Sequence, residues 1–207
     1  MEKATRIVYV TDSGQGKHFE GVFKAARDAG WLGECLVEHV GFGLVQGEDG
    51  KKFATRNLCL NRESNYKFSY SRMLSLQGNT APYMLYARTR VCSIVRKAQG
   101  LTDDDTMVWP TPGGNVVLEE REEIELARHA VKFGDVVDQV GRDLYPNVLC
   151  DYLFELSQKF SAFYETCPVN QAESEEVRES RLALAVVTNN VLVRGMDILG
   201  IEVVERM

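Results

Sequence analysis

The 207-residue chain is long enough for one ordinary domain or two small ones, and its 44% hydrophobic and 26% charged content is typical of a soluble globular protein. No apolar run approaches bilayer-spanning length, and no secretory signal or Arg/Ser-rich transit segment opens the chain, so we expect a cytoplasmic protein, with an organellar location left open. The net charge of −6 argues against a broad basic face for nucleic acid, but it is compatible with a local basic patch.

The cysteines and histidines predict neither a disulfide framework nor a metal centre. The five cysteines are widely spaced and never form Cys-x-x-Cys, so we expect reduced structural thiols. Neither His18 nor His39 has a carboxylate or a second histidine at ligand spacing, and both are expected to be structural hydrogen-bonding groups. His129 is expected on the polar side of a helix, without a chemical role.

The first part of the chain has the pattern of a βαβ unit. Residues 7–10 form a β-branched run, residues 18–29 carry apolar side chains at helical spacing, and residues 36–45 supply further apolar runs. A glycine-flanked turn, residues 47–52, follows. Because parallel sheets are covered on both faces, a piece of about 55 residues is expected to be the last part of a larger Rossmann-type domain.

The second part of the chain is predicted to be a helical bundle. Apolar residues from Tyr83 to Val95 mark one face of a long helix, with Thr80 near its start. Residues 99–116 contain three aspartates, two prolines and paired glycines, which predicts a loop. Further helical patterns cover about 117–132, 147–165 and 177–199. The expected fold is therefore an α/β fragment, residues 1–72, followed by an all-α domain, residues 73–207.

The loop after the first strand resembles a phosphate cradle only superficially. Gly16-Lys17 is followed by His18 rather than Ser or Thr, and the position five residues before Gly16 is Thr11 rather than glycine. The dinucleotide-binding pattern also fails, because Phe19 stands where a small residue is needed. A turn with flexible glycines is the better interpretation.

A stronger candidate is the loop that contains Gly50, Lys51 and Lys52. Paired lysines on a glycine-flanked loop, beyond the carboxyl end of a parallel strand, stand where ligands bind in open α/β sheets. Their ammonium groups can neutralise charge that develops on a phosphate during transfer. As a bare motif the loop is equally compatible with an ordinary solvated turn.

Five segments in colinear order resemble arginyl-tRNA synthetases, which are class I aminoacyl-tRNA synthetases. They are RIVYVTDSGQGKHFEGVFKAARDAGW, HVGFGLVQGEDGKKFATR, SRMLSLQGNTAPYMLYARTRVCSI, LCDYLFELSQKFSAFYETCPV and LGIEVVERM. The resemblance implies the end of the catalytic domain followed by an anticodon-binding helical domain of the DALR type. It also implies arginine–tRNA ligase activity with ATP as substrate, Mg²⁺ entering with ATP, no structural metal, and tRNA for arginine and L-arginine as partners of a monomeric enzyme.

The resemblance assigns roles to individual residues. Gln15 matches the glutamine of the arginine pocket, where a neutral amide accepts from the guanidinium. The loop that closes over ATP is matched by Gly50, Lys51, Lys52, Thr55 and Arg56, with the two lysines stabilising the transition state in which pyrophosphate leaves. The anticodon loop is expected to meet Tyr83, Tyr86, Arg90, Tyr152 and Met207, because aromatic rings and arginine suit stacking on unpaired bases. Tyr83 also lies on the apolar face of its helix, so a core position stays open.

Departures from the family pattern leave alternatives open. The His-x-Gly-His signature is absent from the 207 residues, Ala54 replaces a usually basic residue, and the chain runs almost directly from Arg56 to Asn61 where family members carry several dozen more residues. We expect a truncated and internally shortened ligase with little or no activity by itself. A non-catalytic tRNA-binding module is the main alternative, and a nucleotide-binding protein using Lys17 is a weaker one.

Overall fold

The computed structural model describes residues 4–43, 69–102, 105–111 and 116–206, together with the backbone of residues 45–46 and 66–67. The chain divides into two compact units, Met1–Ser69 and Tyr70–Met207. The sequence-based division falls between residues 72 and 73. Each unit is described by itself.

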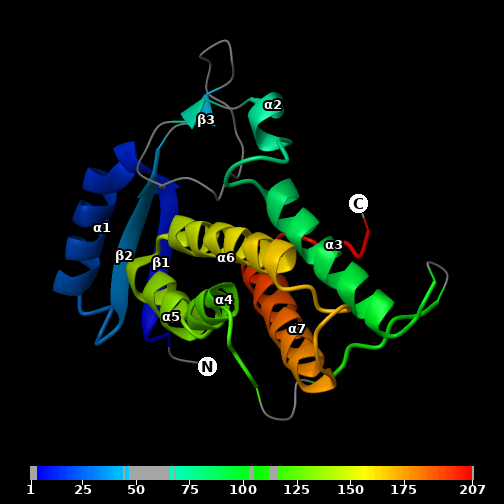
Figure 1. Ribbon diagram of the computed structural model, residues 1–207. Helices are drawn as coiled ribbons and strands as arrows, with labels where there is room; N and C mark the ends of the chain where they lie inside the picture. Colours follow the sequence, from blue (N-terminus) through cyan, green and yellow to red (C-terminus); the bar gives the residue numbers. More distant parts are fainter. Residues whose placement is uncertain are drawn as a thin grey trace. The chain divides into compact units, whose positions relative to one another are not determined.

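The first unit is built on a parallel β-strand pair, as the sequence predicted. Strand β1 (Arg6–Asp12) leads through a 3-10 turn (Ser13–Gln15) into helix α1 (Gly16–Asp28), and β2 (Leu36–Phe42) pairs with β1 in parallel (Figure 1). A second parallel pair joins the backbones of β3 (Val45–Gln46) and β4 (Tyr66–Lys67). A strand, a helix and a parallel strand in this order form a βαβ unit.

Helix α1 packs on one face of the sheet through aromatic rings. The ring of Tyr9 lies 5.1 Å from that of Phe19 and 5.4 Å from that of Phe23, centre to centre. Because side chains alternate along a strand, Val10 points to the opposite face, where it is 63% exposed. Leu36, on that same face, is 48% exposed. The described part of this unit therefore leaves apolar surface of a parallel sheet open to solvent.

The second unit is a helical bundle. Its helices are α2 (Tyr70–Met73), α3 (Ala81–Ala98), α4 (Arg121–Ala130), α5 (Phe133–Asp143), α6 (Pro146–Thr166) and α7 (Glu175–Ile198). Helices α3, α4, α6 and α7 pack on one another and enclose a core in which Leu126, Leu153 and Phe160 are fully buried. Among the described residues, none of the helices is both long and apolar enough to cross a membrane.

Helix starts follow side-chain capping. The Thr80 hydroxyl accepts from the N–H of Tyr83 at 3.3 Å, and the Ser174 hydroxyl accepts from the N–H of Val177 at 3.2 Å. These bonds satisfy N–H groups that a helix leaves without an internal partner, and they fix where α3 and α7 begin.

Helix α4 is shorter than predicted and α5 was not predicted. The Ser180 hydroxyl bonds both the N–H and the carbonyl of Val117, at 2.9 and 2.7 Å, and α4 begins only at Arg121. Helix α5 contains three valines and two glycines, whose helix propensity is low, so packing rather than propensity forms it. It ends at Leu144, whose φ of 58° lies in the left-handed region, directly before the helix that Pro146 opens.

Helices α6 and α7 approach closely at Gly195. A Cβ placed on Gly195 would lie 2.5 Å from Cδ2 and 3.1 Å from Cγ of Leu153, which is fully buried. Gly195 therefore permits a separation between the helices that any side chain would increase.

Candidate functional site

Tyr86, Arg90 and Tyr164 form a surface group, here called the aromatic–arginine cluster. Tyr86 and Arg90 are one turn apart on α3, and the Arg90 Cζ lies 4.6 Å from the centre of the Tyr86 ring. The same Cζ lies 5.4 Å from the ring of Tyr164, which α6 contributes. Tyr86 is 41% exposed and Tyr164 is 37% exposed. The cluster thus brings two predicted residues together with one that the sequence reasoning missed.

The geometry of the cluster suits a flat ligand. A guanidinium over an aromatic face is stabilised by the ring quadrupole, which orders the arginine without hiding the whole of either ring. One Nη of Arg90 also donates to the Tyr86 hydroxyl at 3.3 Å. Exposed aromatic faces beside an arginine plane are the groups on which unpaired nucleic-acid bases stack.

A sequence signal for Tyr164 exists in the pattern of α6. Phe160 and Phe163 are fully buried. Tyr164 follows them at the edge of the apolar face, where an aromatic residue with a polar tip can meet both core and solvent. What the pattern did not show is that this edge faces Arg90 on another helix.

Positive charge is concentrated on α3. The helix contains four basic residues and no acidic residue, in a chain whose net charge is −6. Lys97 is exposed, and at about 100° per residue it lies roughly 20° from Tyr86 around the helix axis. The surface of α3 that carries Tyr86 therefore also carries a lysine, which the sequence reasoning did not single out.

Tyr83 is partly buried. Its ring packs on Phe154 of α6, with the centres 5.3 Å apart and the planes tilted by 59°. Tyr83 thus lies between core and surface, and both an anticodon contact and a core role stay open for it.

Tyr152 lies in the core of the bundle rather than on its surface. It is 5% exposed, and its hydroxyl donates to the carbonyls of His129 and Ala130 at 3.0 and 3.2 Å. Burial raises the pKa of this phenol above its ordinary value. A buried ring with its hydroxyl engaged cannot stack on a base, so this position argues against the predicted anticodon contact.

His129 is also buried, which corrects its predicted place on the polar side of a helix. It is 7% exposed and its Nε2 donates to the Tyr152 carbonyl at 3.0 Å. Its ring lies flat on that of Tyr152, with centres 4.5 Å apart. The two residues join the end of α4 to α6.

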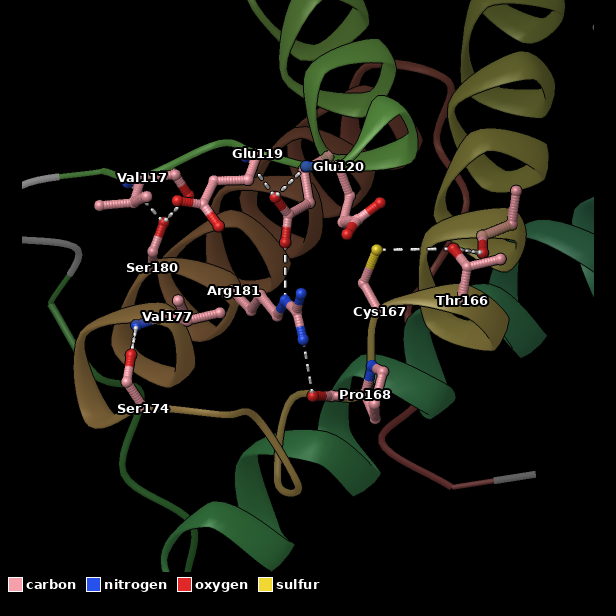
Figure 2. Close-up of polar contacts among 12 residues, drawn as sticks. Val117, Glu119, Glu120, Thr166, Cys167, Pro168, Ser174, Val177, Ser180 and Arg181 are labelled. Carbon is pink, nitrogen blue, oxygen red and sulfur yellow. Dashed lines mark hydrogen bonds and ion pairs between the residues drawn. The ribbon is translucent and has the colours of Figure 1, made fainter.

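A buried ion pair joins α4 to α7 (Figure 2). The Nε of Arg181 donates to Oε1 of Glu123 at 2.6 Å, and Oε2 accepts from the N–H groups of Glu119 and Glu120 at 2.9 and 3.0 Å. Burial alone would raise the pKa of Glu123, but these hydrogen bonds and the Arg181 charge lower it below its ordinary value. The pair holds α4 against α7 and is itself buried.

Gln15 is exposed at the carboxyl end of β1, where ligands of open α/β sheets bind. The turn that carries it packs closely on β2, since a Cβ on Gly41 would lie 3.0 Å from the Cα of Ser13. Below the turn, the Thr11 hydroxyl and His39 Nε2 are 2.8 Å apart, and the His39 ring stacks on Phe19. His39 therefore has the structural hydrogen-bonding role that the sequence predicted.

The same turn is a poor phosphate cradle. Oδ1 of Asp12 accepts from the N–H of Gly14 at 2.9 Å, so a carboxylate occupies a donor that a bound phosphate would need. This geometry supports the interpretation of the loop as a turn that presents Gln15.

The remaining predicted site residues lie outside the described residues. They are Gly50, Lys51, Lys52, Thr55 and Arg56 of the lysine loop, and Met207 at the C-terminus. Within the part of the chain that the structure describes, no three His, Cys, Asp or Glu side chains gather as a metal centre would require.

Two known families match this chain, one over the α/β unit and one over the helical unit. Residues 1–60 match the family described as tRNA synthetases class I (R), catalytic domain, and residues 84–207 match the DALR anticodon binding domain. The aromatic–arginine cluster lies within the second match. The predicted fold class, a catalytic fragment followed by an anticodon-binding helical domain, is confirmed.

Curated relatives named arginine–tRNA ligase match the whole chain. The protein from Cyanothece sp. is 43% identical and that from Synechococcus elongatus 42% identical. The chain spans 44% of the length of each. The first alignment covers 265 positions against 207 residues here, a difference of 58, so the matched part of that relative is longer than this chain.

Solved arginyl-tRNA synthetases share the fold. The enzyme of Plasmodium falciparum superposes with a TM-score of 0.78 at 27% identity, over 98% of this chain and 41% of that one. The enzyme of Thermus thermophilus superposes with a TM-score of 0.83 at 23% identity, over 99% and 42% respectively, a likeness of fold alone. The DALR anticodon binding domain matches more than half of the chain, and the class I (R) catalytic domain matches residues 1–60, so the chain belongs to the arginyl-tRNA synthetase family.

Proposed function

We propose that this chain is the C-terminal portion of an arginine–tRNA ligase, and that its helical unit binds the anticodon loop of tRNA for arginine. The observation that carries the proposal is the aromatic–arginine cluster on α3 and α6, which lies within the segment that matches the DALR anticodon binding domain. Stacking of a base on an aromatic ring contributes about 1–3 kcal/mol, so Tyr86 and Tyr164 would supply much of the affinity.

The positive charge on α3 supports the same surface as the tRNA-binding site. The cluster already contains the guanidinium of Arg90, and Lys97 is exposed on the same side of the helix. Contacts between basic side chains and phosphates supply sequence-independent affinity and position the nucleic acid, while stacked bases supply selectivity. A chain that is acidic overall would thereby direct tRNA to one helix.

The fragment of the catalytic domain would carry part of the amino-acid and ATP sites. In the complete reaction, arginine and ATP form an enzyme-bound adenylate and pyrophosphate, and arginine then passes to the 3′ end of tRNA. Gln15 would accept from the arginine guanidinium. Lys51 and Lys52, on the loop with Gly50, Thr55 and Arg56, would neutralise charge on the departing pyrophosphate, with Mg²⁺ entering on ATP.

The 207 residues by themselves are proposed to be inactive in aminoacylation. They contain no His-x-Gly-His signature, and the described sheet leaves Val10 and Leu36 exposed on one face. These two observations favour a second candidate function, a tRNA-binding module without catalysis. Arginine-dependent exchange of pyrophosphate into ATP by the isolated chain separates the candidates: we expect none above background, and robust exchange would refute the inactive state.

Affinity for tRNA tests the proposed surface. We expect Tyr86→Ala, Arg90→Ala and Tyr164→Ala each to weaken binding of a transcript of tRNA for arginine by roughly tenfold, measured by fluorescence anisotropy. Arg194→Ala is the matched control, because Arg194 is an exposed arginine on α7, paired with Asp197 one turn away. Equal losses in all four variants, or none in the first three, would refute the assignment of the surface.

A further inference from the structure

Arg88 is a buried arginine that holds the C-terminal end of the described chain. It lies on α3, is 5% exposed, and one Nη donates to the carbonyl of Val204. Among the residues that the structure describes, its Nε has no hydrogen-bond partner and no carboxylate forms an ion pair with it. A buried charge with so few partners is expensive, so the bond to Val204 satisfies a group that otherwise needs water.

A second contact holds the same segment. Arg96, two turns further along α3, lies 3.5 Å from the carboxylate of Glu205. In Figure 1 the C-terminal segment, in red, passes behind α3. Residues 201–206, here called the C-terminal segment, are thus fixed on α3 by two arginines, one of them buried.

The C-terminal segment borders the face of α3 on which the aromatic–arginine cluster stands. At about 100° per residue, Arg90 lies roughly 40° to one side of Tyr86 around the helix axis, and Arg96 lies roughly 80° to the other side. Tyr164 of α6 contacts the Arg90 side, and Glu205 contacts the Arg96 side. The exposed face of α3, which carries Tyr86 and Lys97, therefore lies between α6 and the C-terminal segment.

We propose that Arg88 is a positioning residue for tRNA recognition: by binding the Val204 carbonyl it holds the C-terminal segment as the second edge of the anticodon surface. The inference rests on the proposed function for its consequence in tRNA binding, but the position of the segment is a property of the free protein. Arg88 itself is buried and does not contact tRNA.

One property of Arg88 and one of Val204 make the proposal testable without unfolding the chain. Because no described carboxylate pairs with Arg88, Arg88→Met leaves no counter-charge buried without a partner, and it removes a charge that is costly to bury, so the variant is expected to fold. The Val204 carbonyl can turn to water when the segment leaves α3, because Val204 is 39% exposed. The cost of the substitution should therefore appear in the position of the segment rather than in the bundle.

The first measurement reports on the segment in the absence of tRNA. Carboxypeptidase removes residues one at a time from the C-terminus, and digestion past Val204 requires the segment to leave α3, because the Val204 carbonyl is bound by Arg88. We expect Arg88→Met to raise the digestion rate roughly tenfold. Glu205→Gln weakens the contact of Arg96 with the exposed carboxylate of Glu205 and should raise the rate less. Arg194→Met removes an equal charge from α7 and should leave the rate unchanged. An unchanged rate in Arg88→Met would overturn the proposal.

The second measurement separates the position of the segment from the loss of positive charge. In the full chain, Arg88→Met should weaken binding of the transcript of tRNA for arginine roughly tenfold. In a chain that ends at Ile201, the same substitution should change the affinity less than twofold, because the segment on which Arg88 acts is gone. An equal loss in both chains would overturn the proposal. If the unaltered chain binds no tRNA, the proposed function fails, and the digestion rate alone decides whether Arg88 holds the segment.

Discussion

Each of the residues His129 and Tyr152 bonds the backbone carbonyl of the other while their rings lie stacked. Nε2 of His129 donates to the Tyr152 carbonyl and the Tyr152 hydroxyl donates to the His129 carbonyl, both at 3.0 Å. The carbonyls in the last turn of a helix have no partner within it, and here the Tyr152 hydroxyl supplies one at the end of α4. The pair thus stabilises the junction of α4 and α6 and leaves Tyr152 unavailable to a ligand.

Tyr152→Phe should lower the free energy of unfolding without affecting tRNA binding. The substitution keeps the ring but removes the donor to two buried carbonyls, which costs about 1–2 kcal/mol. Urea denaturation of the full chain measures the loss. Tyr83→Phe is the control. It also removes a phenol hydroxyl, but it keeps the packing of the ring on Phe154, so stability should change little. A loss of tRNA affinity with unchanged stability would instead support the anticodon contact that the sequence predicted for Tyr152.

Glu123→Gln should destabilise the chain by about 3 kcal/mol at neutral pH, because it leaves the buried Arg181 without a counter-charge. The folded-state pKa of Glu123 lies below its ordinary value of 4.5, so its carboxylate contributes stability above pH 4.5 and loses it as pH falls through the lower, folded-state pKa. The difference in unfolding free energy between the two proteins should therefore stay constant from pH 7 to 5 and shrink below pH 4.5. A difference that shrinks between pH 7 and 5 would show that the folded-state pKa is raised.

Gly195→Ala should destabilise the bundle by about 1–3 kcal/mol, although alanine is the better helix former. The new Cβ would lie 2.5 Å from Leu153 Cδ2, in a fully packed region between α6 and α7. Gly134→Ala in α5 is the matched control, since its Cβ would meet no atom within 4 Å and the substitution should be neutral or stabilising. Thermal unfolding compares the variants, and equal shifts in the same direction would contradict the close approach at Gly195.

Lys97→Ala should reduce the salt dependence of tRNA binding. If Lys97 contacts a phosphate, its removal lowers the slope of log affinity against log salt concentration by roughly one. Lys132, an exposed lysine at the start of α5, provides the control and should leave the slope unchanged when replaced by alanine. A slope that Lys97→Ala does not alter would remove this lysine from the proposed surface.

The sequence predicted the elements whose signals are local. The parallel pairing of β1 and β2 followed from a strand, a helix and a second apolar run. Helices α3, α6 and α7 followed from their helical patterns, with Thr80 as the predicted cap of α3. Such signals lie within ten to twenty consecutive residues and survive folding. Tyr86 and Arg90 were singled out by the family resemblance, and the structure places the Arg90 guanidinium over the Tyr86 ring.

The remaining features depend on residues far apart in the chain. Tyr164 joins the cluster only because α6 packs beside α3, and Arg88 meets Val204 across 116 positions. His129 carries a polar side chain, and nothing near it in the sequence shows that Tyr152 would bury it. Polar residues buried by long-range partners give no periodic signal, which is why the sequence misplaced His129 and did not show that Tyr152 is buried.

The measurement that tests the central claim most directly is the affinity of the unaltered 207-residue chain for two transcripts of tRNA for arginine, identical except at the three anticodon bases. If the aromatic–arginine cluster stacks anticodon bases, the transcript with the changed anticodon should bind at least tenfold more weakly at the same salt concentration. Equal affinities for the two transcripts would contradict the account.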